Sequence, residues 1–329
     1  MKKIIINCIL ILATAQLPLN AQALSCNCSD ISLRKVTAKS GLVLRKLPSS
    51  NSEKVIGIPF NEKVIIGIDY DFQKEETIEN IAGYWVRANY RGHEGFLFNG
   101  YLSGDPLYEI VHNADWEYAV DFEKEYMGLF TDGKETFDQG KMQFKKIKID
   151  TMKYVGENEP EICGMVDFEE ENYPYYVFTG LNSYERNIEI KLFEMEEGSI
   201  YPGAMRTIYY SGSSYTIYAT GQVVKTKGDS TNPWETMVIK NYQVILERRS
   251  PDAVQQQVIM ECKEMPVSYW GSGQLANIRL VGDLDGDAQP DFIFENYLME
   301  GFEASLYLSS EAENGFLVKL VRKIFGACC

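Results

Sequence analysis

Gly282-Asp283-Leu284-Asp285-Gly286-Asp287-Ala288-Gln289-Pro290-Asp291 leads directly into the apolar run Phe292-Ile293-Phe294. Counted from Asp283, carboxylates stand at positions 1, 3, 5 and 9 of a loop over 283–291. Side chains at positions 1, 3 and 5 of a tight loop point to the same side, where calcium takes its oxygen ligands at about 2.3–2.6 Å. Crowded carboxylates repel one another unless a cation neutralises them. The stretch therefore predicts a Ca²⁺ loop between two β-strands, with Asp283, Asp285, Asp287, Gln289 (through its carbonyl) and Asp291 as ligands.

The loop resembles the D-x-D-x-D-G-x-x-D calcium sites of FG-GAP and related proteins, which lie between strands. It does not fit an EF-hand, because position 12 is Phe294 where a bidentate Glu is required. Position 6 is Ala288 where such loops have Gly, and a left-handed backbone there costs about 1 kcal/mol. The alternative to a calcium site is an acidic turn exposed to water, with Leu284 alone buried.

The surroundings of the loop carry a second resemblance. Residues 281–287, 305–312 and 317–321, together with 215–221 (Y-T-I-Y-A-T-G), look like the end of a family of exported bacterial proteins of unknown function. That resemblance implies one calcium-bearing β-domain over 115–329 and offers no reaction.

The same region reads as strands throughout. About a dozen short runs of β-branched and aromatic residues, separated by turns such as Ser211-Gly212-Ser213-Ser214, predict one all-β sandwich or barrel over 115–329. Some of these strands are rich in tyrosine, and their rings could form a platform on which sugars stack, although such tyrosines more commonly pack on a sheet. These residues are Tyr173, Tyr175, Tyr176, Tyr209, Tyr210, Tyr215 and Tyr218.

A smaller β-unit precedes this region. S-G-L-V-L-R-K-L-P-S (40–49), W-V-R-A-N-Y-R-G-H-E-G-F-L (85–97) and N-G-Y-L (99–102) occur in the order and spacing of the bacterial SH3 (SH3b) domain, which the segment 36–104 resembles. The resemblance implies a small barrel that binds a cell-wall peptide or a protein partner, with Tyr84 and Trp85 as candidate ligand contacts. The segment 69–82 is longer than in the family and is expected to be a solvated acidic insertion. Gly104 and Pro106 mark a linker over 105–114.

The first 23 residues predict a secretory signal peptide. Lys2 and Lys3 precede an apolar run over 4–15, and Ala21-Gln22-Ala23 is a small-x-small cleavage signal. A lipid anchor on Cys26 is the alternative, although Ala23 stands where a lipoprotein box has Leu. No later stretch is apolar enough for a transmembrane helix, so we expect an exported protein that is periplasmic, attached to the cell envelope or secreted.

Six cysteines remain after removal of the signal. An even number in an exported chain indicates disulfides, and zinc is the alternative that the spacing fits less well. The candidates are Cys26 and Cys28 in the segment 24–35, then Cys163, Cys262, Cys328 and Cys329.

Charge limits the partners of the chain. The net charge is −15, and loss of the two lysines of the signal makes it −17. So acidic a chain is repelled by phosphate backbones and anionic lipid, which argues against nucleic acid and bare membrane surfaces as partners.

Catalytic sets that need histidine are absent from the region 115–329, because the only histidines are His93 and His112. A Cys-His or Ser-His-Asp enzyme in that region is therefore excluded. The sequence predicts a non-enzymatic binding protein. The alternative is a carbohydrate-active hydrolase that uses a pair of carboxylates, for which the acidic chain offers many candidates.

Overall fold

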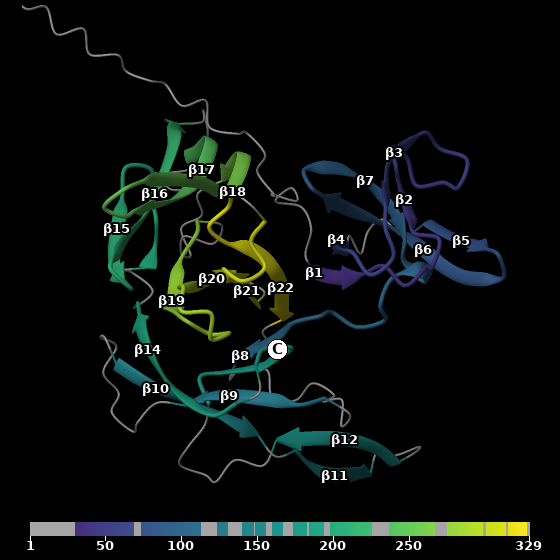
Figure 1. The fold of residues 1–329 in the computed structure, drawn as a ribbon, viewed down its shortest axis with the longest axis horizontal. Coiled ribbons are helices and arrows are strands. Elements are labelled where there is room, and N and C mark those ends of the chain that lie inside the picture. Colours follow the sequence, from purple (N-terminus) through teal and green to yellow (C-terminus); the bar gives the residue numbers. More distant parts are fainter. Residues whose placement is uncertain are drawn as a thin grey trace, which may run out of the picture.

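The computed structural model describes residues 30–68, 74–112, 124–130, 140–147, 149–155, 160–166, 174–182, 184–193, 198–225, 237–266, 275–298, 301–313 and 315–327. Their elements are twenty-two strands and one short 3-10 helix (Figure 1), which confirms the all-β fold class. The signal peptide, Cys26, Cys28, Cys328 and Cys329 lie outside the described residues. No helix among the described residues is long and apolar enough to cross a membrane.

The N-terminal module, residues 30–102, has its own core. Ten buried residues fill it, among them Leu44, Val64, Val86 and Leu97. An isolated bridge between Val36 and Leu102 joins the beginning of the module to its end. Its elements are β1 (Asp30–Lys35), β2 (Leu42–Arg45), β3 (Lys54–Ile58), β4 (Lys63–Ile68), β5 (Lys74–Ile78), β6 (Ile81–Tyr90), β7 (His93–Phe98) and the 3-10 helix η1 (Asn99–Tyr101).

The expectation of a loop over 69–82 is wrong for its second half, although Lys74, Glu75 and Thr77 are exposed, as expected for a solvated insertion. Lys74–Ile78 forms β5, which pairs with β6 in register Thr77 to Ala82 and Glu75 to Tyr84. Glu79 and Asn80 at the turn both have positive φ, 51° and 67°. Positive φ at both central residues is the geometry of a two-residue hairpin turn that matches the twist of its strands. The Glu-Asn pair is a less common form of this turn, and the sequence pattern did not reveal it.

A continuous antiparallel sheet joins the N-terminal module to the rest of the chain. β1 pairs with β4 on one side and with β22 on the other. The sheet then runs β22-β21-β20-β19-β14-β10-β9-β13-β8, so the segment expected to be a linker contains β8. These strands are β8 (Glu109–His112), β9 (Tyr126–Phe130), β10 (Gly140–Ile147), β13 (Tyr176–Thr179), β14 (Arg186–Leu192), β19 (Ile278–Gly282), β20 (Asp291–Leu298), β21 (Gly301–Leu308) and β22 (Lys319–Ala327).

A four-stranded sheet covers one face of this large sheet (Figure 1). In β16 every second residue from Ser213 to Ala219 is buried, which is the alternation of a strand with one face on a core. The Tyr307 hydroxyl of β21 donates to the Ile259 carbonyl of β18 at 3.1 Å, across the two sheets. The strands are β15 (Met205–Tyr210), β16 (Ser213–Lys225), β17 (Met237–Arg249) and β18 (Val254–Pro266); β11 (Ile149–Val155) and β12 (Pro160–Val166) form a separate hairpin.

Strand β4 contributes side chains to both cores, and β1, which pairs with it, contributes to the large core. Ile31, Leu33 and Ile65 pack into the large core, whereas Val64 and Ile66 pack into the core of the N-terminal module. The alternation of a strand places neighbouring side chains on opposite faces. The module is therefore attached through shared strands and not through a flexible tether.

A buried guanidinium reinforces this junction. Arg322 of β22 donates to Glu109 Oε2 of β8 at 2.9 Å and to Asp30 of β1. Its side chain is 10% exposed. One residue thus links the first described strand, the first strand after the module and the last strand.

Candidate functional site

The acidic loop lies where the sequence places it, between β19 and β20, which pair through Gly282 and Asp291. Carboxylate oxygens of Asp283, Asp285 and Asp287 all lie within 4.8 Å of one another. Three of the five predicted ligands therefore converge. Because Asp285 and Asp291 are buried as well as Leu284, the alternative of a water-exposed acidic turn does not describe this loop.

Main-chain donors shape the loop around its first carboxylate. Asp283 Oδ1 accepts from the amides of Gly286 at 2.6 Å and Asp287 at 3.0 Å, and Oδ2 accepts from Ala288 at 3.0 Å. Ala288 has φ 66°, so the residue at position 6 adopts the left-handed backbone that glycine would take more cheaply. The fold holds this strained residue in place through the bond to Asp283.

Asp291 anchors the loop from beneath. Its carboxylate accepts from the Leu284 amide at 2.7 Å, the Ser309 amide at 2.8 Å and the Ser309 hydroxyl at 3.0 Å. Burial raises the pKa of Asp291 well above its usual range. Gln289 also has a protein partner, since its side-chain oxygen accepts from the Tyr215 hydroxyl at 3.0 Å. The Asp291 side chain is not part of the group formed by Asp283, Asp285 and Asp287, whereas the position-7 carbonyl of Gln289 stays a predicted ligand.

Two serines that sequence reasoning missed complete the surroundings of the loop. The Ser309 hydroxyl lies 3.0 and 3.1 Å from the two carboxylate oxygens of Asp287, and Ser310 donates to Asp285. They follow β21, whose pairing with β20 returns the chain to the loop. The motif L-Y-L-S-S after an apolar strand was the available signal. Burial, and then the charges of Asp287 and Asp283, raise the pKa of Asp285.

The donor set suits a hard cation. Carboxylate and hydroxyl oxygens are the ligands that calcium and magnesium prefer, and the triad supplies several at one point. A hollow of about 150 Å³ adjoins the loop and is lined by Asp285, Asp287, Ser310, Tyr108 and Asn182, among others.

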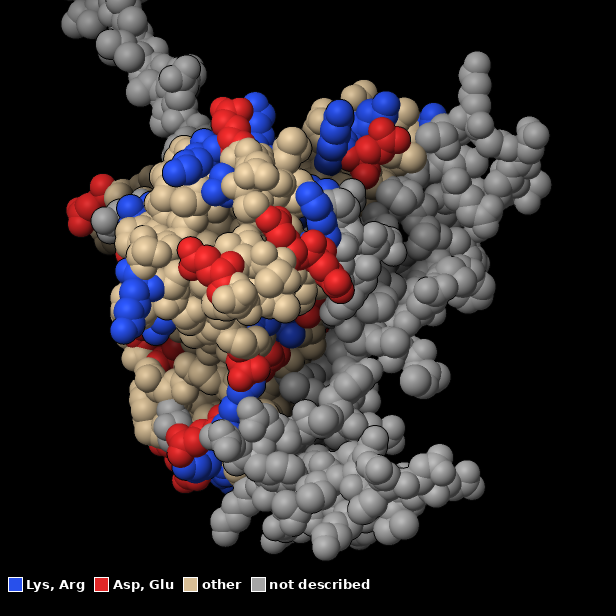
Figure 2. All heavy atoms as spheres, turned by 90° about the vertical axis from the view of Figure 1, so that its right-hand side faces the viewer, with Lys and Arg blue, Asp and Glu red and all other residues tan. Residues whose placement is uncertain are grey.

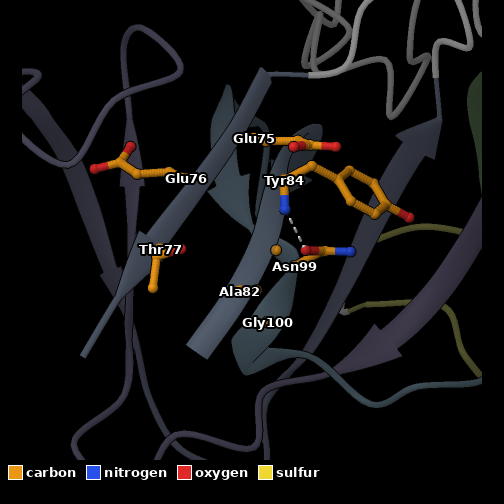
Figure 3. Close-up of a pocket in the computed structure, with 8 residues that line it drawn as sticks. Glu75, Glu76, Thr77, Ala82, Tyr84, Asn99 and Gly100 are labelled. Atoms are coloured by element: carbon orange, nitrogen blue, oxygen red, sulfur yellow. Dashed lines mark hydrogen bonds between the residues drawn. The ribbon is translucent and has the colours of Figure 1, made fainter. Parts of the chain in front are cut away.

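A second and larger hollow lies on the N-terminal module, along the β5–β6 hairpin. It measures about 590 Å³ and is lined by Glu75, Glu76, Thr77, Ala82, Gly83, Tyr84, Asn99 and Gly100. Figure 3 shows Glu75, Tyr84 and Asn99 extending to one side of the hairpin, with Glu76 on the other. The Tyr84 amide donates to Asn99 Oδ1 at 2.7 Å, which fixes the η1 turn against β6.

The two predicted ligand contacts of this module take different positions. Tyr84 lines the hollow, whereas Trp85 is buried, with its ring centroid 5.9 Å from that of Phe98. The Trp85 indole donates to Glu76 Oε2 at 2.7 Å. A hydrogen bond from Ser50, and then the one from Trp85, lower the pKa of Glu76, so this carboxylate stays ionised.

The other candidate residues fall elsewhere. Cys262 is a buried free thiol that donates to the Glu264 carbonyl at 3.3 Å, so it forms no disulfide here. Of Cys163 only the backbone is described, within β12, and pairing of the remaining cysteines stays a prediction. The tyrosines do not share a face: Tyr209 is 82% exposed, whereas Tyr215 is 3% exposed and Tyr176 is fully buried.

Seen from the side of the N-terminal module, acidic and basic side chains alternate over the described surface, with uncharged areas between them (Figure 2). This face carries no continuous basic patch among the described residues. Comparison with protein-family models, with curated proteins and with solved structures found no match.

Proposed function

We propose that the chain is an exported, non-enzymatic binding protein whose N-terminal module recognises a cell-wall peptide or a protein of the cell envelope. The observation that carries the proposal is the hollow of about 590 Å³ along the β5–β6 hairpin, with Tyr84 on its wall. Concave sites with a few convergent polar groups and an aromatic ring are the usual form of a binding site. The likeness of 36–104 to SH3b domains and the signal sequence support the same role.

The large β-region would carry and orient this module. Its acidic loop fits a structural Ca²⁺ that Asp283, Asp285 and Asp287 would hold, with the Gln289 carbonyl as a further donor. Asp291 would act as the anchor of the loop, because the Leu284 and Ser309 donors already occupy its oxygens. Bound calcium would neutralise the triad and fasten β19 to β20. The alternative of a carbohydrate-active hydrolase has no observation in its favour among the described residues.

The proposal predicts that the full chain is retained on purified peptidoglycan and that Tyr84→Ala lowers this retention at least about tenfold, as expected for loss of a central aromatic contact. Retention would be measured by sedimentation over a range of peptidoglycan concentrations. Tyr209→Ala is the matched control, because Tyr209 is an exposed tyrosine on the four-stranded sheet. Equal retention of wild type and Tyr84→Ala would place any wall binding outside the hollow. A chain that is not retained would rule out the wall peptide as its ligand.

A further inference from the structure

The side of the hollow that carries Tyr84 also carries a carboxylate, Glu75, that has no partner within the part of the chain that the structure describes. Glu75 and Tyr84 stand directly opposite each other on β5 and β6. Cross-strand partners have Cβ atoms about 4.5–5.5 Å apart, so a carboxylate and an aromatic ring lie side by side there. Figure 3 shows both extending in the same direction.

Glu75 differs in this respect from its neighbour Glu76. Glu76 accepts hydrogen bonds from Ser50 and Trp85, whereas Glu75 is exposed and makes no hydrogen bond or ion pair among the described residues. The described residues that line the hollow include no Lys or Arg. Lys74 precedes Glu75 on the same strand, and the alternation of side chains turns it to the other face, with Glu76. The negative charge of Glu75 is therefore available to a ligand.

Asn99 adds a donor on the same side. Its Oδ1 accepts from the Tyr84 amide at 2.7 Å, which leaves its Nδ2 group to donate outward, where Figure 3 shows it beside the Tyr84 ring. The floor is main chain held close to Phe98: a Cβ on Gly100 would lie 2.6 Å from the Phe98 ring and 2.8 Å from Ile81. A fixed amide donor above a rigid floor suits a peptide carbonyl.

We propose that this hollow binds a peptide that bears an ammonium group, which pairs with the Glu75 carboxylate against the face of the Tyr84 ring while a peptide carbonyl accepts from Asn99 Nδ2. A carboxylate beside an aromatic face attracts a cation through its charge and through the ring quadrupole. The proposal rests on the proposed function, since it concerns the same hollow, and it adds the chemical class of the ligand. Ionised Glu76 on the other side of the hairpin adds to the negative potential.

The test is calorimetric titration of the full chain with two blocked tripeptides, acetyl-Gly-Lys-Gly-amide and acetyl-Gly-norleucine-Gly-amide, which differ at the ammonium group. The lysine peptide is expected to bind about tenfold more tightly, from one ion pair and one cation–π contact at an exposed site. Glu75→Gln is expected to abolish the difference. Raising the salt concentration to 1 M is expected to reduce it, because the Debye length falls to about 3 Å.

Glu94→Gln is the matched control. It removes the same charge from an exposed position of β7 that does not line the hollow, and the preference for lysine should remain. Equal affinity for the two peptides, an unchanged preference in Glu75→Gln, or no binding of either peptide would overturn cation recognition. The proposed function would then be judged separately, by whether Tyr84→Ala still lowers retention on peptidoglycan.

Discussion

Replacing Arg322 by methionine is expected to lower the free energy of unfolding by about 3–5 kcal/mol, the range for breaking a buried ion pair by removing one partner. Arg322 is the only cation within hydrogen-bond reach of both Asp30 and Glu109 among the described residues. Their side chains are 18% and 23% exposed, so both carboxylates would be left largely buried without a hydrogen-bonded cation, and Arg34 would act on them only at longer range. Urea unfolding of the full chain, followed by tryptophan fluorescence, measures the change.

Arg91→Met is the control for this substitution. Arg91 pairs with Glu62 at 3.4 Å, but the two side chains are 61% and 38% exposed. Exposed pairs contribute about 0–1 kcal/mol, so this variant should unfold close to wild type. Comparable losses in the two variants would mean that Arg322 does not hold the β1, β8 and β22 junction together.

Calcium at 10 mM is expected to stabilise the chain against heat, and Asp285→Ala is expected to remove this stabilisation. For a weak extracellular site with a Kd of about 10⁻⁴ M, the gain at a hundredfold excess is about 2.7 kcal/mol. Asp285 is buried within the triad, so the substitution removes a central ligand. A water molecule cannot take the place of this carboxylate unless the loop rearranges. Scanning calorimetry with calcium and with excess chelator measures the difference for each variant.

Asp252→Ala is the matched control, because Asp252 is an exposed aspartate in the β17–β18 turn. It should keep the full difference between calcium and chelator. Identical melting of the wild type in calcium and in chelator would refute the cation site. A difference that survives in Asp285→Ala would place calcium elsewhere on the chain.

The acidic loop shows what local sequence can predict. The spacing of Asp283, Asp285 and Asp287 was enough to place three carboxylates together, because a tight loop fixes the direction of alternate side chains. The same spacing did not reveal that Asp291 is an anchor, since its donors include Ser309, which follows β21. Such partners depend on strand pairing, which a pattern within one loop does not contain.

The N-terminal module shows the same limit at a larger scale. The motifs at 40–49 and 85–97 coincide with β2 and with the β6–β7 hairpin, because β-branched and aromatic residues and turns mark these strands locally. The segment 24–35 was described only by its cysteines, yet its residues 30–35 form β1, which pairs with β4 of the module and with β22 of the large region. Pairing between residues almost 300 positions apart, as between Ile31 and Lys323, leaves no periodic signal in either segment.

The location of ligand binding at the β5–β6 hairpin is tested most directly by the Tyr84 amide resonance of the full chain labelled with ¹⁵N-tyrosine. This amide donates to Asn99 Oδ1 at the wall of the hollow, and Tyr84→Phe identifies its signal by removing it from the labelled set. Addition of soluble peptidoglycan fragments is predicted to shift this resonance in a saturable way, while the Tyr209 resonance stays in place. Saturable shifts of other tyrosines with an unmoved Tyr84 signal would contradict binding in the hollow.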